Sequence, residues 1–180
     1  GEAGLLQRQL AAMTAISPVE LFANNDVRLL IDGPATFQAM FDALEQARES
    51  ILLQSYIVDR SDIATRLGEV LARKQAQGVS VRLLYDGVGS AGADPAYFER
   101  LHAAGVATCA FNPPDPLQRP GYWGISHRDH RKILSIDRQV GFTGGVNISA
   151  VYSAGSFRRT ARGPRGLPDQ GWRDTHVRLA

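Results

Sequence analysis

The sequence predicts one α/β domain with a mixed, largely parallel central sheet flanked by helices on both faces. Between about residues 51 and 111, short β-rich segments alternate with amphipathic helical segments, as parallel strands joined by crossover helices require. The chain has 180 residues, of which 44% are hydrophobic and 21% charged. These values are typical of one globular domain with a substantial core.

The first part of the chain alternates helix and strand. Leu6, Leu10 and Met13 predict a short amphipathic helix over residues 1–16. Residues 19–33 read as a strand pair around an Asn-Asn-Asp turn, ending at Gly33-Pro34. After these come, in order, a helix over 35–50, a strand over 51–58, a helix over 61–77, a strand over 79–86, a helix over 95–105 and a strand over 106–111. The strand over 51–58 is almost continuously apolar, which predicts a central strand covered on both faces.

The second part reads as loops, a hairpin and a final strand. Residues 112–126 are rich in Pro and Gly and carry Tyr122 and Trp123, which serve either as interfacial anchors or as packing beneath the loop. Strands are expected in 132–137, 140–145 and 174–179. An Arg-rich segment lies between, at 153–173; a long segment without secondary structure is usually functional or disordered.

Composition limits the function classes. The net charge of +2 gives no overall field for anionic partners. The single cysteine, Cys109, rules out an intrachain disulfide. No apolar run approaches the roughly 20 residues that span a bilayer. Because the chain begins at Gly1 and stops within a predicted strand, we expect a piece of a longer protein: a helical extension over 1–16 and a domain over 17–180.

The richest chemistry lies in residues 127–149. His130 and Lys132 are two positions apart, so both side chains project from the same face of a strand. Gly144 and Gly145 allow backbone to approach a ligand closely. Asn147 and Ser149 add uncharged hydrogen-bonding groups. An imidazole, an ammonium, an amide and a hydroxyl on one surface suit a phosphoryl group, which the imidazole would attack or protonate.

At this spacing the residues resemble a known signature. His130-x-Lys132-x4-Asp137-x6-Gly144-Gly145-x-Asn147 is similar to the HKD motif of the phospholipase D superfamily, HxKx4Dx6G[GS]xN. Further blocks, "ILLQSYIVD", "GVSVRLLYDGVGS" and "WRDTHVRL" among them, resemble the first half of bacterial cardiolipin synthases. The resemblance extends from about residue 27 to 179 and implies a phospholipase D-like domain.

The resemblance implies a mechanism and a set of catalytic residues. His130 would attack a phosphodiester and form a phosphohistidine, Lys132 would bind phosphate, and Asn147 would supply the motif amide. Asp174 would orient the histidine. Asp137 is expected to be a structural ion-pair or turn partner rather than a proton donor. No metal or other cofactor is implied.

The resemblance also implies partners. Family members carry two HKD motifs and this chain has one, so a second HKD domain or a second subunit would supply the acid. A phosphatidylglycerol-like phospholipid would be the substrate, at an anionic membrane surface on the cytoplasmic face of the bacterial inner membrane. Nucleic acid is not favoured, and the fragment itself is expected to be soluble and weakly active.

Other residues keep two interpretations. Arg158 and Arg159, in the Arg-rich segment, belong either to a solvated loop or to a substrate-binding lid that faces anionic lipid heads. Asp86 follows a predicted strand, where it would border the substrate or simply form a turn. His127 lacks a lysine two positions on, and a metal site combining it with His130 and Cys109 finds no further ligand at recognisable spacing.

Two other functions remain open. A homodimeric single-motif phosphodiesterase or nuclease fits the length, and its basic loop would bind a phosphate backbone. A non-catalytic lipid-binding module is the other alternative.

Overall fold

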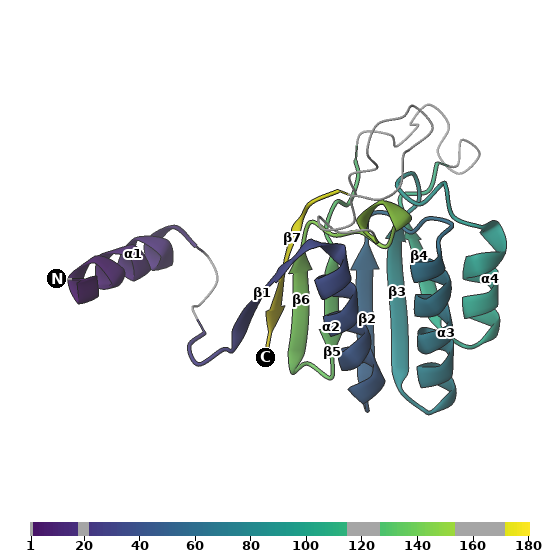
Figure 1. Ribbon diagram of the computed structural model, residues 1–180, viewed down its shortest axis with the longest axis horizontal. Coiled ribbons are helices and arrows are strands. Elements are labelled where there is room, and N and C mark those ends of the chain that lie inside the picture. The colour runs from purple at the N-terminus through teal and green to yellow at the C-terminus, as the bar shows by residue number, and fades with distance from the viewer. Residues whose placement is uncertain (1, 18–21, 115–126, 154–171) are drawn as a thin grey trace.

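The computed structural model describes residues 2–17, 22–114, 127–153 and 172–180. Its elements, all but η1 labelled in Figure 1, are α1 (Glu2–Ile16), β1 (Val27–Ile31), α2 (Asp32–Gln46), β2 (Ser50–Ser55), α3 (Asp62–Ala76), β3 (Ser80–Asp86), α4 (Pro95–Ala103), β4 (Ala107–Phe111), β5 (Ile133–Ile136), β6 (Val140–Gly144), η1 (Ala150–Tyr152) and β7 (Thr175–Leu179). The predicted α/β class is confirmed.

The seven strands form one mixed sheet in the order β1-β7-β6-β5-β2-β3-β4. The neighbours β2, β3 and β4 are parallel, whereas the other four pairs, β1 with β7, β7 with β6, β6 with β5 and β5 with β2, are antiparallel. The sheet is therefore mixed as predicted but not largely parallel. Crossover helices join β2, β3 and β4, whereas a tight hairpin joins β5 to β6, and a hairpin forces antiparallel pairing.

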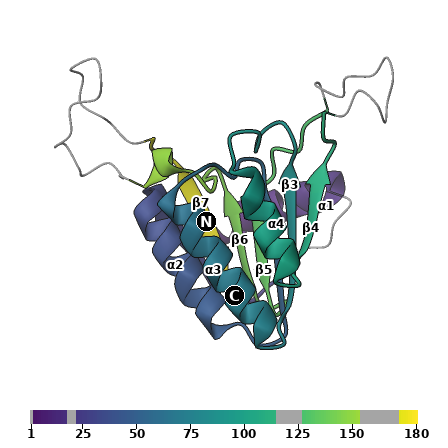
Figure 2. The ribbon, with the colours of Figure 1, turned by 90° about the vertical axis from the view of Figure 1, so that its right-hand side faces the viewer.

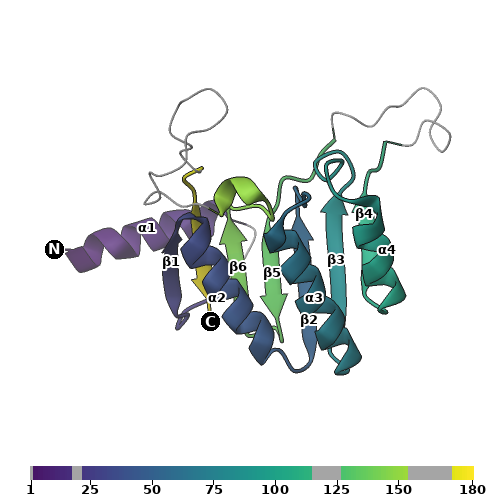
Figure 3. The same ribbon diagram turned by 45° about the vertical axis from the view of Figure 1, so that its right-hand side comes forward.

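In the part of the chain that the structure describes, helices cover one face of the sheet. Figures 2 and 3 show α2, α3 and α4 side by side on that face. Ile51, Leu53, Leu83, Leu134 and Phe142 point into this layer and are at most 4% exposed. The predicted second helical layer is absent from these residues. Leu52, expected to be buried in a doubly covered strand, is 41% exposed on the other face.

The N-terminal strand differs from its prediction. Residues 22–26 form no strand, and β1 pairs instead with β7, almost 150 residues later in the chain. Helix α2 starts at Asp32 and takes in Gly33 and Pro34, which were expected to end the strand as a turn. Proline is tolerated there because amides in the first helical turn have no intrahelical acceptor. Gly33 is required by packing, since a Cβ would lie 1.9 Å from the Tyr152 carbonyl oxygen.

The apolar side chains of helix α1 are exposed to solvent. Leu5, Leu6, Leu10 and Met13 are all more than 40% exposed. No helix among the described residues is both long and apolar enough to cross a membrane.

Candidate active site

The sheet topology gathers the motif residues at one edge. Strands β2, β3 and β4 are parallel, and their carboxyl ends lie at the upper edge of the sheet in Figure 1. Because β5 and β7 start at this edge and β6 ends there, the segments before β5, after β6 and before β7 meet at the same place. Residues far apart in sequence, from Tyr56 to Asp174, therefore surround one short stretch of edge.

His130 and Lys132 lie in the extended segment that leads into β5. The imidazole of His130 stacks on the ring of Tyr56, with ring centroids 3.8 Å apart and planes inclined by 21°. The Lys132 ammonium donates a 2.6 Å hydrogen bond to the His130 carbonyl oxygen and lies 5.3 Å from the Tyr56 ring centroid. His130 remains exposed, so its ring is open to an incoming substrate.

Lys132 shares its surroundings with Asp174 and His176. Lys132 and His176 line the same small cavity beneath the sheet edge. Burial lowers the pKa of the Lys132 amine, while the charge of Asp174 opposes that shift. His176 is 2% exposed, its Nδ1 finds no hydrogen-bond partner among the described residues, and burial lowers its pKa to about 4. The result is a neutral imidazole packed behind a lysine.

The two motif glycines are needed for close packing. Gly144 has φ +155°, and a Cβ there would lie 2.4 Å from the Thr175 carbonyl oxygen. A Cβ on Gly145 would lie 1.9 Å from Oδ1 of Asp174. Both glycines therefore let the end of β6 approach the residues that begin β7, which places Asp174 beside the motif.

Asn147 and Ser149 point into the protein. The Asn147 side chain is buried; its Oδ1 accepts a 3.2 Å bond from the Ile57 amide and its Nδ2 donates a 3.1 Å bond to the Tyr152 hydroxyl. The Ser149 hydroxyl is also buried and accepts a bond from Val151 N–H at the start of η1. In this arrangement Asn147 joins the segment after β2 to the segment after β6, and Ser149 caps η1.

Asp137 lies away from the histidine, at the far end of β5. Its carboxylate accepts hydrogen bonds of 2.7–2.9 Å from the amides of Arg48, Glu49 and Ser50. Burial raises the pKa of Asp137, but these three donors outweigh it and hold the pKa below the usual value. The geometry is that of a turn partner which fixes the start of β2.

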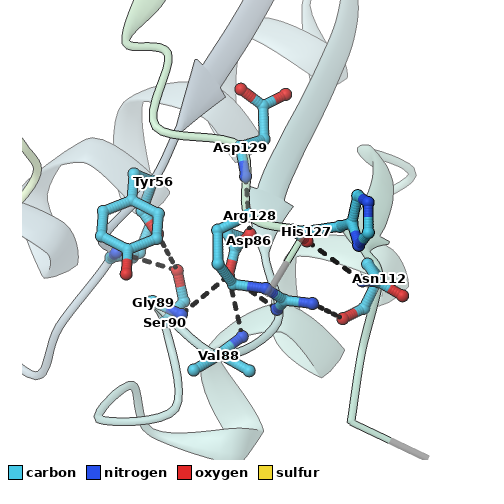
Figure 4. Close-up of polar contacts among 10 residues, drawn as sticks. Tyr56, Asp86, Val88, Gly89, Ser90, Asn112, His127, Arg128 and Asp129 are labelled. Carbon is cyan, nitrogen blue, oxygen red and sulfur yellow. Dashed lines mark hydrogen bonds and ion pairs between the residues drawn. The ribbon is translucent and has the colours of Figure 1, made fainter. Parts of the chain in front are cut away.

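Asp86 is a buried anchor at the carboxyl end of β3 (Figure 4). It is 1% exposed and forms a 3.1 Å ion pair with Arg128, itself nearly buried. It also accepts hydrogen bonds from the amides of Val88, Gly89 and Asp129. These donors hold the pKa of Asp86 below its usual value although burial opposes them. Asp86 thus ties the segment before His130 to the sheet, which leaves its carboxylate committed to the protein rather than to substrate.

Comparison with known proteins identifies the family. The family model described as "Cardiolipin synthase, PLD-like domain" matches residues 40–155, which include His130, Lys132 and Asn147. The chain belongs to this PLD-like domain family. Cardiolipin synthase A of Pseudomonas putida (strain W619) is 41% identical over 173 residues, and that of Pseudomonas fluorescens (strain Pf-5) is 37% identical over 174. These matches cover 94% and 95% of this chain but 33% of each relative, so the chain spans about a third of their length.

Solved structures agree with the PLD-like fold. Nuc from Salmonella typhimurium, a phospholipase D family member, superposes with a TM-score of 0.58 at 14% identity, covering 87% of this chain and 83% of its own. Phosphatidylserine synthase from Haemophilus influenzae Rd KW20 gives a TM-score of 0.67 at 14% identity, covering 96% of this chain and 37% of its own. At such identities these structures support the fold alone.

The sequence of this PLD-like domain did not point to Tyr56, and it did not decide whether His176 lines the site or packs in the strand. Tyr56 lies inside the block "ILLQSYIVD", and nothing in its spacing connects it with His130, 74 residues later. Alternation along the last strand did place His176 on one side with Asp174, yet its burial depends on helix α2. Arg158, Arg159, Tyr122 and Trp123 fall outside the described residues. Within the described ranges, no group of three His, Cys, Asp or Glu side chains is placed to hold a metal ion.

Proposed function

We propose that this chain supplies the nucleophilic half of a phosphatidyltransferase of the cardiolipin synthase type. The observation that carries the proposal is the exposed His130 imidazole beside the Lys132 ammonium, within a complete HKD spacing in a PLD-like domain. A nucleophile open to solvent with a cation next to it suits attack on an anionic phosphodiester.

The proposed reaction has two steps. A His130 nitrogen bonds to phosphorus while the bond from phosphorus to the first alcohol breaks, and an acid protonates the departing alcohol. A second alcohol then attacks the phosphohistidine, displaces the imidazole and gives up its proton. Lys132 offsets the charge on the phosphoryl oxygens. Asp174 counteracts the effect of burial on the Lys132 pKa and so favours the charged amine.

The proposal needs a second HKD motif for the acid. Relatives three times as long as this chain have room for a second PLD-like domain, and a second subunit would serve the same purpose. We place the substrate among phosphatidylglycerol-like lipids. The working location is then an anionic membrane surface on the cytoplasmic side of the bacterial inner membrane.

The test is trapping of phosphate-labelled radioactive phosphatidylglycerol on the full-length protein that carries this chain, with each reaction quenched in alkaline detergent. We expect wild-type protein to hold an alkali-stable, acid-labile label and to form cardiolipin. His130→Ala should lose both signals, whereas His127→Ala, three residues away, should keep them. Full transfer activity in His130→Ala contradicts the proposal, and hydrolysis of nucleic acid without phosphatidyl transfer would favour the nuclease instead.

A further inference from the structure

Tyr56 is the side chain in closest ring contact with the proposed nucleophile. Its ring lies almost parallel to the His130 imidazole at a centroid distance of 3.8 Å, and the Lys132 ammonium lies over the same ring at 5.3 Å. Tyr56 follows β2, whereas His130 and Lys132 precede β5. One aromatic ring, from the segment after β2, thus lies near both the imidazole and the ammonium of the motif.

The end of β3 and the loop that follows it, residues 86–92, contact Tyr56. The Ser90 hydroxyl donates to the Tyr56 carbonyl oxygen at 3.2 Å and accepts from the Val58 amide at 3.0 Å (Figure 4). A Cβ on Gly89 would lie 2.4 Å from the Tyr56 carbonyl oxygen and 2.7 Å from its ring. Tyr56 therefore rests directly against the backbone of this loop, and its position is fixed.

The same region also contacts the segment that carries His130. Asp86 accepts the Asp129 amide at 3.0 Å and pairs with Arg128 at 3.1 Å, immediately before His130. Asp129 in turn bonds the Arg131 amide and guanidinium, so both neighbours of His130 are anchored. Because one loop contacts both segments, the backbones that carry the two rings are held side by side.

The stacking has a chemical consequence when the imidazole reacts. A neutral imidazole becomes positively charged as its nitrogen bonds to phosphorus, and that charge is absent from the ground state. The face of a tyrosine ring is electron-rich and attracts a cation within about 6 Å. An interaction that strengthens as charge develops lowers the barrier rather than merely improving binding.

We propose that Tyr56 is a positioning residue for the nucleophile: its ring orients the His130 imidazole toward phosphorus and stabilises the positive charge that the imidazole gains in the first step. This inference rests on the proposed function, because it takes His130 as the nucleophile. The hydroxyl of Tyr56 has no part in it, so phenylalanine should replace tyrosine.

Single-turnover labelling of the full-length protein tests the kinetic part. We expect Tyr56→Leu to slow phosphohistidine formation on the order of tenfold, with the lipid concentration for half-maximal rate unchanged. Tyr56→Phe should restore the rate. Loss of labelling in His130→Ala together with an unchanged rate in Tyr56→Leu would overturn this inference and leave the proposed function standing. Labelling that survives His130→Ala would overturn both.

Proton NMR of this chain tests the geometry without any activity. A ring stacked at 3.8 Å shifts the His130 ring protons upfield. The shift should vanish in Tyr56→Leu and persist in Tyr56→Phe. Gly89→Ala should weaken it by displacing Tyr56, whereas Gly92→Ala, in the same loop with open space around it, should not. His130 protons that resonate at the same position in wild type and Tyr56→Leu would contradict the stacked arrangement.

Discussion

At the scale of single residues, His176 shows how burial sets charge near the site. It is buried on β7 beside Lys132, whose positive charge adds to the effect of burial, while Asp174 opposes it. Its pKa is lowered from 6.5 to about 4. Protonation of His176 would place a second buried cation near Lys132, and within the described part of the chain Nδ1 has no hydrogen-bond partner; both effects disfavour the charged form.

We predict that His176 makes the protein less stable as the pH falls from about 6.5 to about 4. Between these pH values His176 is protonated in the unfolded chain but still neutral in the folded one. The free energy of unfolding therefore decreases as the pH is lowered. His176→Gln should remove on the order of 2 kcal/mol of that fall. His102→Gln, on the exposed face of α4, should keep the wild-type slope. Urea unfolding across the window measures it, and equal slopes in all three proteins would contradict the prediction.

Spacing alone was sufficient to single out His130 and Lys132, because a motif is a local pattern. Spacing also suggested that Asn147 and Ser149 bind a ligand, which stays a prediction; in the structure Asn147 is buried and bonds the Ile57 amide, and Ser149 is buried and caps η1. An amide or a hydroxyl can bind either a ligand or the protein itself. For Asn147, the contact depends on where the chain runs after β2. Tyr56 had no local signal at all, since its partner comes from a distant segment.

At the scale of elements, Asp137 fixes the junction between α2 and β2. Its three amide donors belong to residues 48–50, almost 90 positions earlier in the chain. Asp137→Ala leaves those amides without their charged acceptor, and we expect a loss of about 2 kcal/mol in the free energy of unfolding. Asp42→Ala removes one exposed contact with Gln38 and should cost less than about 0.5 kcal/mol. Unchanged stability in Asp137→Ala with lost phosphatidyl transfer would instead assign it to the chemistry.

Helical periodicity predicted α2, α3 and α4 well because each buries one face against the sheet. Strand partners were less predictable. Pairing of β1 with β7 joins segments with no sequence relation, and it displaced the local strand pair expected before residue 33. Alternation within a strand tells which side chains share a face, but it does not tell what covers that face.

At the scale of the whole molecule, the sheet face opposite the helices is apolar and uncovered in the described part of the chain. The strand registers put six exposed side chains on this face, 37–62% exposed: Val27, Leu29, Ile31, Leu52, Ile133 and Leu179. Leu52 and Ile133 also line a hollow of about 330 Å³. Exposed apolar side chains gathered on one sheet face are typical of an interaction surface.

We predict that, in a full-length protein of the relatives' size, a segment outside this chain covers this face. The relatives are about three times as long as this chain, so they supply enough further structure to bury it. Leu52→Lys and Ile133→Lys should change the stability of the isolated chain by less than about 1 kcal/mol, because both side chains already face solvent. In the full-length protein each should cost about 2 kcal/mol or more, because a charge would then be buried without a partner. Gln38→Lys, on the outer side of α2, should be neutral in both. Chemical unfolding of the two proteins measures the difference, and equal small effects in both would show that the face stays open.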